Sequence, residues 1–123
     1  MVGDIRGKHC AVIDDELLTG STVLEDTKRL IENGAASVRI YVVHPVLDCQ
    51  KSGAKAVVRR IADSEVVQIV VTDSIPVLHK VKNENKFEVL TIAPLLAEAI
   101  SRIVLGKSIS DLYKLENVPL YEG

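Results

Sequence analysis

The chain has 123 residues, of which 47% are apolar and 3% aromatic, and its formal net charge of −2 suits one domain with an aliphatic core. Acidic and basic residues are mixed, with no basic stripe and few aromatic rings for stacking, which excludes a nucleic-acid partner. The polar start of the chain and the lack of any apolar run of about 20 residues exclude a signal peptide and a membrane span, so we expect a cytoplasmic protein.

The first half of the chain predicts two strands, each followed by a helix. Residues 10–14 are a short apolar run that ends in acid, which is typical of a buried strand. Residues 19–22 predict a turn, and the apolar spacing of residues 23–33 predicts an amphipathic helix that stops before a glycine. A second strand is expected at Ser37–His44, and a weaker helix at residues 51–62.

The second half repeats this alternation less regularly. Residues 66–72 are nearly continuous in β-branched side chains and predict a strand buried on both faces. A charged loop follows at 73–86, then a fourth strand at 87–92. A helix is expected at 94–104, because a proline stands at its start and a glycine after its end. A short turn is expected at 110–113.

Strands that alternate with helices predict an α/β fold, with a parallel sheet, helices on both faces and right-handed crossovers. The expected order is β-α-β-α-β-β-α, or one helix more if the loop at 73–86 contains a helical turn. We expect residues 1–9 to be a lead-in, 10–106 to be the α/β domain and 107–123 to be a tail.

The segment 12–22, Val-Ile-Asp-Asp-Glu-Leu-Leu-Thr-Gly-Ser-Thr, has the chemistry of a sugar-phosphate site. Ligands of parallel sheets bind at the carboxyl ends of strands. Backbone N–H groups, hydroxyls and a helix start suit a phosphate, and Gly20 permits close approach. Asp14 and Asp15 offer acceptors for ribose hydroxyls. Because adjacent strand residues point to opposite faces, we expect the strand to end at this pair, and Ser21 or Thr22 to cap the helix.

The predicted substrate-binding residues are Asp14, Asp15, Leu18, Thr19, Gly20, Ser21 and Thr22. For the fragment Thr-Gly-Ser-Thr alone, a plain β–α turn with a helix cap is the alternative interpretation. The segment has neither the Gly-x-Gly-x-x-Gly of a dinucleotide site nor the Gly-Lys of a triphosphate-binding loop. No residues have the spacing of a metal site, so no metal ligand is predicted.

Polar residues elsewhere have two interpretations. His44 is interpreted as a strand-end residue, with a catalytic or metal role as the alternative. Asp73 is either a turn cap or a site residue. The pair Arg59-Arg60 is interpreted as the solvated face of a helix.

The lysines at 80, 82 and 86 are interpreted as part of a solvated loop, with phosphate attraction as the alternative. Cys10 and Cys49 are interpreted as reduced thiols.

Segment 12–22 resembles the phosphoribosyl pyrophosphate loop of the Rossmann-like type I phosphoribosyltransferase fold. The chain as a whole resembles the C-terminal portion of the ribose-phosphate pyrophosphokinases. Further segments similar to that family are residues 2–8, 33–44, 70–76, 92–103 and 106–113. Residues 45–63 depart from it, because they are longer and more helical than the family's turn.

The resemblance implies transfer of diphosphate from ATP to ribose 5-phosphate, with magnesium, to make phosphoribosyl pyrophosphate. Asp14 and Asp15 would hold the ribose hydroxyls, and residues 19–22 the 5-phosphate. Leu18 stands where the family often has an acidic or hydroxyl residue. Much of the ATP site would lie in upstream sequence, so we expect a fragment or truncated homologue that forms homo-oligomers and is inactive alone.

Two other functions remain open. A type I phosphoribosyltransferase would need additional sequence to cover its nucleobase. A non-catalytic, regulatory subunit would keep the fold without the chemistry, and Leu18 favours it.

Overall fold

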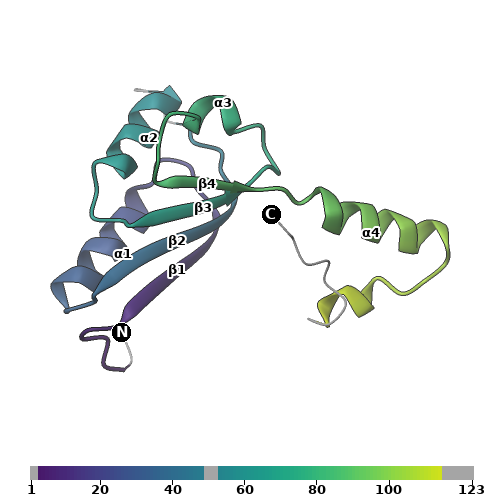
Figure 1. Cartoon of the computed structure of the whole chain (residues 1–123), viewed down its shortest axis with the longest axis horizontal. Coiled ribbons are helices and arrows are strands. Elements are labelled where there is room, and N and C mark those ends of the chain that lie inside the picture. The colour runs from purple at the N-terminus through teal and green to yellow at the C-terminus, as the bar shows by residue number, and fades with distance from the viewer. Residues whose placement is uncertain (1–2, 49–52, 115–123) are drawn as a thin grey trace. The chain divides into compact units, whose positions relative to one another are not determined.

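The computed structural model describes residues 3–48 and 53–114, in which strands and helices alternate (Figure 1). The strands are β1 (His9–Glu16), β2 (Ser37–His44), β3 (Gln68–Thr72) and β4 (Phe87–Leu90). The helices are α1 (Ser21–Glu32), α2 (Gly53–Ala62), α3 (Leu78–Val81), α4 (Ala93–Val104) and the 3-10 helix η1 (Ser110–Tyr113). Cys49, the expected first residues of the second helix and residues 115–123 lie outside the described residues. The predicted α/β class is confirmed, and α3 supplies the additional helix that the sequence left open.

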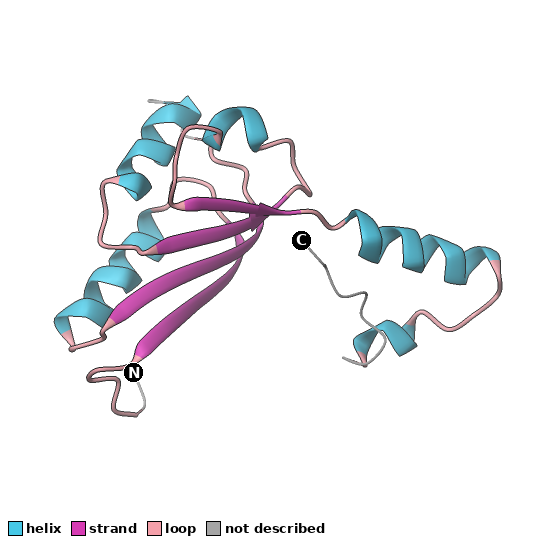
Figure 2. Cartoon of the chain, in the orientation of Figure 1, coloured by secondary structure: helices cyan, strands magenta, loops and turns pink. Residues whose placement is uncertain are grey.

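The four strands form one parallel sheet in the order β1-β2-β3-β4 (Figure 2). Val12 lies beside Ile40, and Ile40 beside Ile69, so apolar side chains of three strands share one face. Helices α1, α2 and α3 bury apolar residues of their own against this face. The buried cluster comprises Leu17, Val23, Ile40, Val42, Leu47, Val57, Val58, Ile61, Val66, Ile69, Val71, Val77 and Val81.

Helices α1, α2 and α3 lie on the same side of this sheet (Figure 1). Each connection leads to the next strand in the same direction, and crossovers of one hand then place every helix on one face. On the other face Ile13 is 80% exposed and Tyr41 is 39% exposed. Up to Leu90 the described helices therefore form one layer, whereas the sequence led us to expect two.

A local signal explains where α1 ends. Gly34 has a φ of 91° and follows the helix, as the sequence predicts. The N–H of Ala35 donates to the Leu30 carbonyl at 3.0 Å, and that of Gly34 to the Ile31 carbonyl at 2.9 Å. These two hydrogen bonds form a Schellman motif, which satisfies carbonyl groups that a helix end otherwise leaves without partners.

Residues from Thr91 onward form a second unit. Pro94 stands in the first turn of α4, as predicted, where its missing N–H has no cost. Gly106, with a φ of 65°, follows the helix end. Among the described residues, no helix has the length and apolar character needed to cross a membrane.

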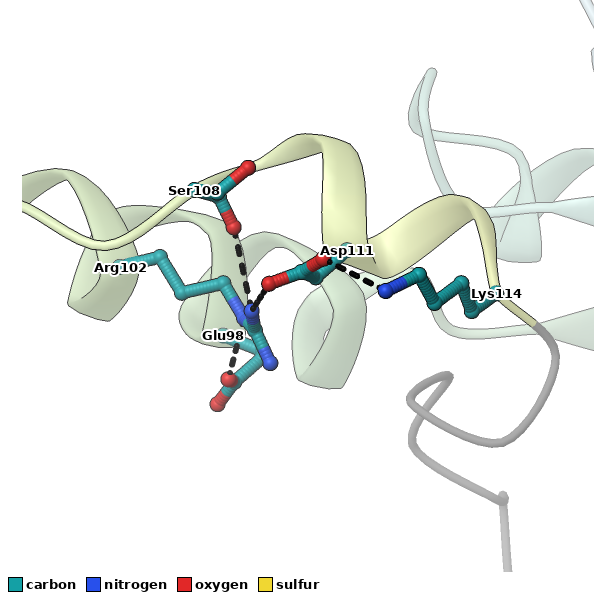
Figure 3. A network of polar contacts seen from close by, with 5 residues as sticks. All are labelled: Glu98, Arg102, Ser108, Asp111 and Lys114. Atoms are coloured by element: carbon teal, nitrogen blue, oxygen red, sulfur yellow. Dashed lines mark hydrogen bonds and ion pairs between the residues drawn. The ribbon is translucent and has the colours of Figure 1, made fainter.

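Arg102 connects α4 to the turn that follows it (Figure 3). Its side chain donates to the Glu98 carboxylate at 2.8 Å and to the Ser108 carbonyl at 3.1 Å. The Asp111 carboxylate in η1 lies 3.8 Å from the same guanidinium and 3.0 Å from Lys114 Nζ. The Glu98–Arg102 pair is thus part of a network that holds η1 against α4.

Candidate functional site

A cavity of about 200 Å³ lies where β1 ends and α1 begins. Six of the seven predicted substrate-binding residues line it, with Asp15 as the exception. The complete lining is Asp14, Glu16, Leu17, Leu18, Thr19, Gly20, Ser21, Thr22 and Val23. The cavity thus brings carboxylates, hydroxyls and the start of a helix together at the carboxyl end of a parallel strand, which is where such sheets bind ligands.

The two adjacent aspartates lie differently in β1. The strand continues through both of them to Glu16, which pairs with His44, so the prediction that it ends at the acid pair is wrong. Successive strand residues point to opposite faces, which explains why Asp14 and Glu16 line the cavity and Asp15 does not. The N–H of Asp15 donates to Asp14 Oδ1 at 2.9 Å. Sequence reasoning missed Glu16, because it ended the strand at the acid pair.

Leu17 anchors the loop between β1 and α1 to the sheet. Its side chain is 1% exposed and belongs to the buried core. Its N–H donates to the His44 carbonyl at 3.0 Å, and its carbonyl accepts from the Leu47 N–H at 2.8 Å. Burial and two backbone hydrogen bonds therefore fix the chain immediately before the residues proposed to bind phosphate.

Gly20 sets the start of α1. It is the N-cap residue with a φ of 74°, so the prediction of Ser21 or Thr22 as the cap is wrong. A Cβ at this position would come within 3.2 Å of Ile61 Cδ1, and a positive φ disfavours any side chain. The N–H groups in a helix's first turn have no partner within the helix, and Ser21, Thr22 and Val23 all line the cavity. Helices bind phosphate with such N-terminal groups.

Arg60 of α2 also holds this loop. Its Nη2 donates to the carbonyl of Thr19, which is 41 residues away in the chain. The preceding residue, Arg59, instead lies 3.8 Å from the carboxylate of Asp63, which directly follows α2. The interpretation of both arginines as a solvated helix face is therefore incomplete, since Arg60 brings a positive charge to the loop. No local pattern in the sequence indicated this contact.

The end of β2 carries a second polar group. Nδ1 of His44 lies 3.0 Å from Oγ of Ser74, and that hydroxyl donates to the Val43 carbonyl at 2.8 Å. Thr72 Oγ1 donates to the same carbonyl at 2.6 Å. His44 therefore connects the ends of β2 and β3 and does not line the cavity. Within residues 3–48 and 53–114, no three His, Cys, Asp or Glu side chains gather as metal ligands would.

Comparison with protein families gives a match to the phosphoribosyl synthetase-associated domain over residues 1–114. The ribose-phosphate pyrophosphokinase of Ralstonia nicotianae is 42% identical over 113 residues, which are 92% of this chain and 34% of that protein. The enzyme of the same name from Neisseria meningitidis serogroup A is 39% identical over 116 residues, or 94% of this chain and 34% of the relative. The chain thus spans about a third of the curated relatives it matches.

The fold has a counterpart among solved structures. The crystal structure of phosphoribosylpyrophosphate synthetase from Mycobacterium smegmatis superimposes with a TM-score of 0.75 at 33% identity, covering 85% of this chain and 33% of that one. The resemblance inferred from the sequence is therefore confirmed. The chain belongs to the phosphoribosyl synthetase-associated domain family, in which it is similar to ribose-phosphate pyrophosphokinases.

Proposed function

We propose that this chain is the C-terminal, ribose 5-phosphate-binding part of a ribose-phosphate diphosphokinase. That reaction transfers diphosphate from ATP to ribose 5-phosphate and makes phosphoribosyl pyrophosphate for nucleotide synthesis. The names of the relatives support the reaction, and the cavity at the end of β1 supports the substrate.

One observation carries the proposal: the cavity combines the two kinds of group that a sugar phosphate needs. The first turn of α1 and the hydroxyls of Thr19, Ser21 and Thr22 would donate to the phosphate. The carboxylates of Asp14 and Glu16 would accept from ribose hydroxyls. Arg60, held at the Thr19 carbonyl, would add a favourable charge.

The size of the cavity restricts what it holds. Sites for drug-sized ligands enclose roughly 300–1,000 Å³. A volume of about 200 Å³ lies below that range and suits a ligand as small as a sugar phosphate. Magnesium commonly binds through one or two carboxylates and the phosphates of its substrate, and Asp14 and Glu16 fit that role. When bound, the ion would neutralise charge on the transferred phosphates.

Leu18 favours a second candidate, a subunit that keeps the fold without the chemistry. Its side chain is 47% exposed and lines the cavity, so it offers an apolar surface where a polar contact to the substrate would be expected. The variant Leu18→Asp separates the two candidates. Tighter binding of ribose 5-phosphate by Leu18→Asp would favour the non-catalytic subunit, and weaker binding would favour the enzyme part.

The proposal is tested by titrating the purified chain with ribose 5-phosphate while recording backbone amide shifts by NMR, with ribose and inorganic phosphate as separate titrations. We expect the largest shifts at residues 14–22, and tighter binding of the sugar phosphate than of either fragment. Thr22→Val removes one hydroxyl and should weaken binding, while Ser101→Ala removes an exposed hydroxyl of α4 and should not. The absence of ribose 5-phosphate binding by the parent chain would disprove the proposal.

A further inference from the structure

A second cavity, of about 540 Å³, lies between α2 and α3. It shares no lining residue with the cavity at the end of β1. Its lining comprises Lys55, Val58, Arg59, His79, Lys80, Lys82, Asn83 and Glu84. Seven of these eight residues are charged or polar, and four of them are cationic.

The charge of this cavity is opposite to that of the chain. Lys55, Arg59, Lys80 and Lys82 contribute four cations against the Glu84 carboxylate in the lining, and Arg59 also lies 3.8 Å from the Asp63 carboxylate outside it. The whole chain has a formal net charge of −2. Like charges brought together on a folded surface repel one another. The binding of an anion among them therefore lowers the electrostatic free energy of the cluster.

The walls of the cavity are fixed by the core. Val58 of α2 and Val81 of α3 are both buried in the main apolar cluster, which sets the spacing of the two helices. Lys80 Nζ also donates to the Val46 carbonyl at 2.9 Å. Lys86, which follows Lys80 and Lys82 in the chain, donates to the Ser64 carbonyl at 2.6 Å and does not line the cavity. The cationic groups are thus presented by anchored helices, which lowers the entropic cost of binding.

We propose that this α2–α3 cavity binds an oligophosphate, either inorganic or as the phosphate chain of a nucleotide. The volume falls within the range of small-molecule sites. Three lysines and Arg59 line the cavity, and lysines bind phosphate as point charges. Several phosphate charges in one chain would match several cations in one cavity. This site goes beyond the proposed ribose 5-phosphate site and does not depend on it.

The experiment titrates the chain with tripolyphosphate, ATP, orthophosphate and citrate, and follows backbone amides by NMR. We expect tripolyphosphate and ATP to shift residues 55–59 and 79–84, with orthophosphate and citrate at least tenfold weaker. Equal affinity for tripolyphosphate and ATP would identify the phosphate chain as the ligand, and tighter ATP binding would identify a nucleotide. Citrate binding as tightly as tripolyphosphate would overturn the assignment to phosphate.

Two variants test the location. Lys55→Gln/Lys82→Gln removes two exposed cations that have no side-chain hydrogen-bond partner among the described residues, and should weaken tripolyphosphate binding about tenfold. The matched variant Lys8→Gln removes an exposed lysine from outside the cavity and should leave affinity unchanged. Equal losses in both variants, or shifts confined to residues 14–22, would overturn the proposal. Equal losses in the two variants would overturn this proposal without affecting ribose 5-phosphate binding, so the two proposals fail separately.

Discussion

The two sides of α2 differ in how they contact neighbouring segments. Arg60 reaches the Thr19 carbonyl beside the cavity of β1, whereas Arg59 lines the cavity shared with α3. The first cavity is defined mainly by backbone: a strand end, a glycine and a helix start. The second is defined by long cationic side chains. A binding site of the first kind depends on chain conformation, and one of the second kind depends on charge and salt.

The largest expected effect comes from the residue that anchors the first cavity. Leu17→Ala removes a side chain that is 1% exposed and should lower the free energy of unfolding by about 3 kcal/mol, measured by urea denaturation. Ribose 5-phosphate binding should weaken with it, because the loop loses its anchor. Leu18→Ala, which truncates the exposed neighbour, should change stability by less than about 0.5 kcal/mol. Similar losses from both variants would show that Leu17 does not anchor the loop.

The carboxylates of β1 give the next effect. Asp14→Asn should weaken ribose 5-phosphate binding about thirtyfold, or roughly 2 kcal/mol, because a charged acceptor at the cavity is lost. Asp15→Asn should change affinity less than about threefold, since its side chain does not line the cavity. Isothermal titration calorimetry measures both. Equal losses would mean that both carboxylates contact the sugar.

Gly20 tests the dependence on backbone conformation. Gly20→Ala places a side chain at a φ of 74° and within 3.2 Å of Ile61, and should cost about 1–2 kcal/mol of unfolding free energy. Gly106→Ala has a similar φ of 65° but meets nothing within 4 Å, so it isolates the backbone term. Only Gly20→Ala should also weaken ribose 5-phosphate binding. Unchanged affinity in that variant would separate the glycine from the site.

The smallest effects are expected from the adjacent arginines, and they test the comparison most directly. Arg60→Gln should weaken ribose 5-phosphate binding about threefold and leave tripolyphosphate binding unchanged. Arg59→Gln should weaken tripolyphosphate binding about threefold and leave ribose 5-phosphate binding unchanged. The reason is that Arg59 lines the α2–α3 cavity and does not line the cavity at the end of β1. Calorimetric titration of each variant with both ligands gives the four affinities. Parallel changes in the two variants would show that α2 does not separate two sites.

Much of the fold follows from local sequence. The strand Ser37–His44 has the predicted bounds because its β-branched run is closed by Pro45. The stop of α1 at Asn33-Gly34 follows from the freedom of glycine at positive φ. The proposed site segment was also visible, because its acids, hydroxyls and glycine are contiguous in the chain.

Other features needed the folded chain. Alternation of strands and helices did not reveal that every connection in the first unit leads the same way, which places the described helices of that unit on one face of the sheet. It also did not show that pairing with β2 would extend β1 to Glu16 and turn Asp15 away from the cavity. Strand pairing and order are long-range properties, because they depend on which segments bury surface together.

The sequence by itself therefore determined the elements and the chemistry of the loop after β1, since periodicity, turn residues and contiguous motifs act over a few residues. The tertiary structure alone decided which distant side chains meet. It brings Arg60 to a carbonyl 41 residues away, and it gathers lysines of α2 and α3 around one cavity. The physical reason is that burial of the apolar core fixes how helices pack on the sheet, and the polar groups at their edges are placed as a consequence.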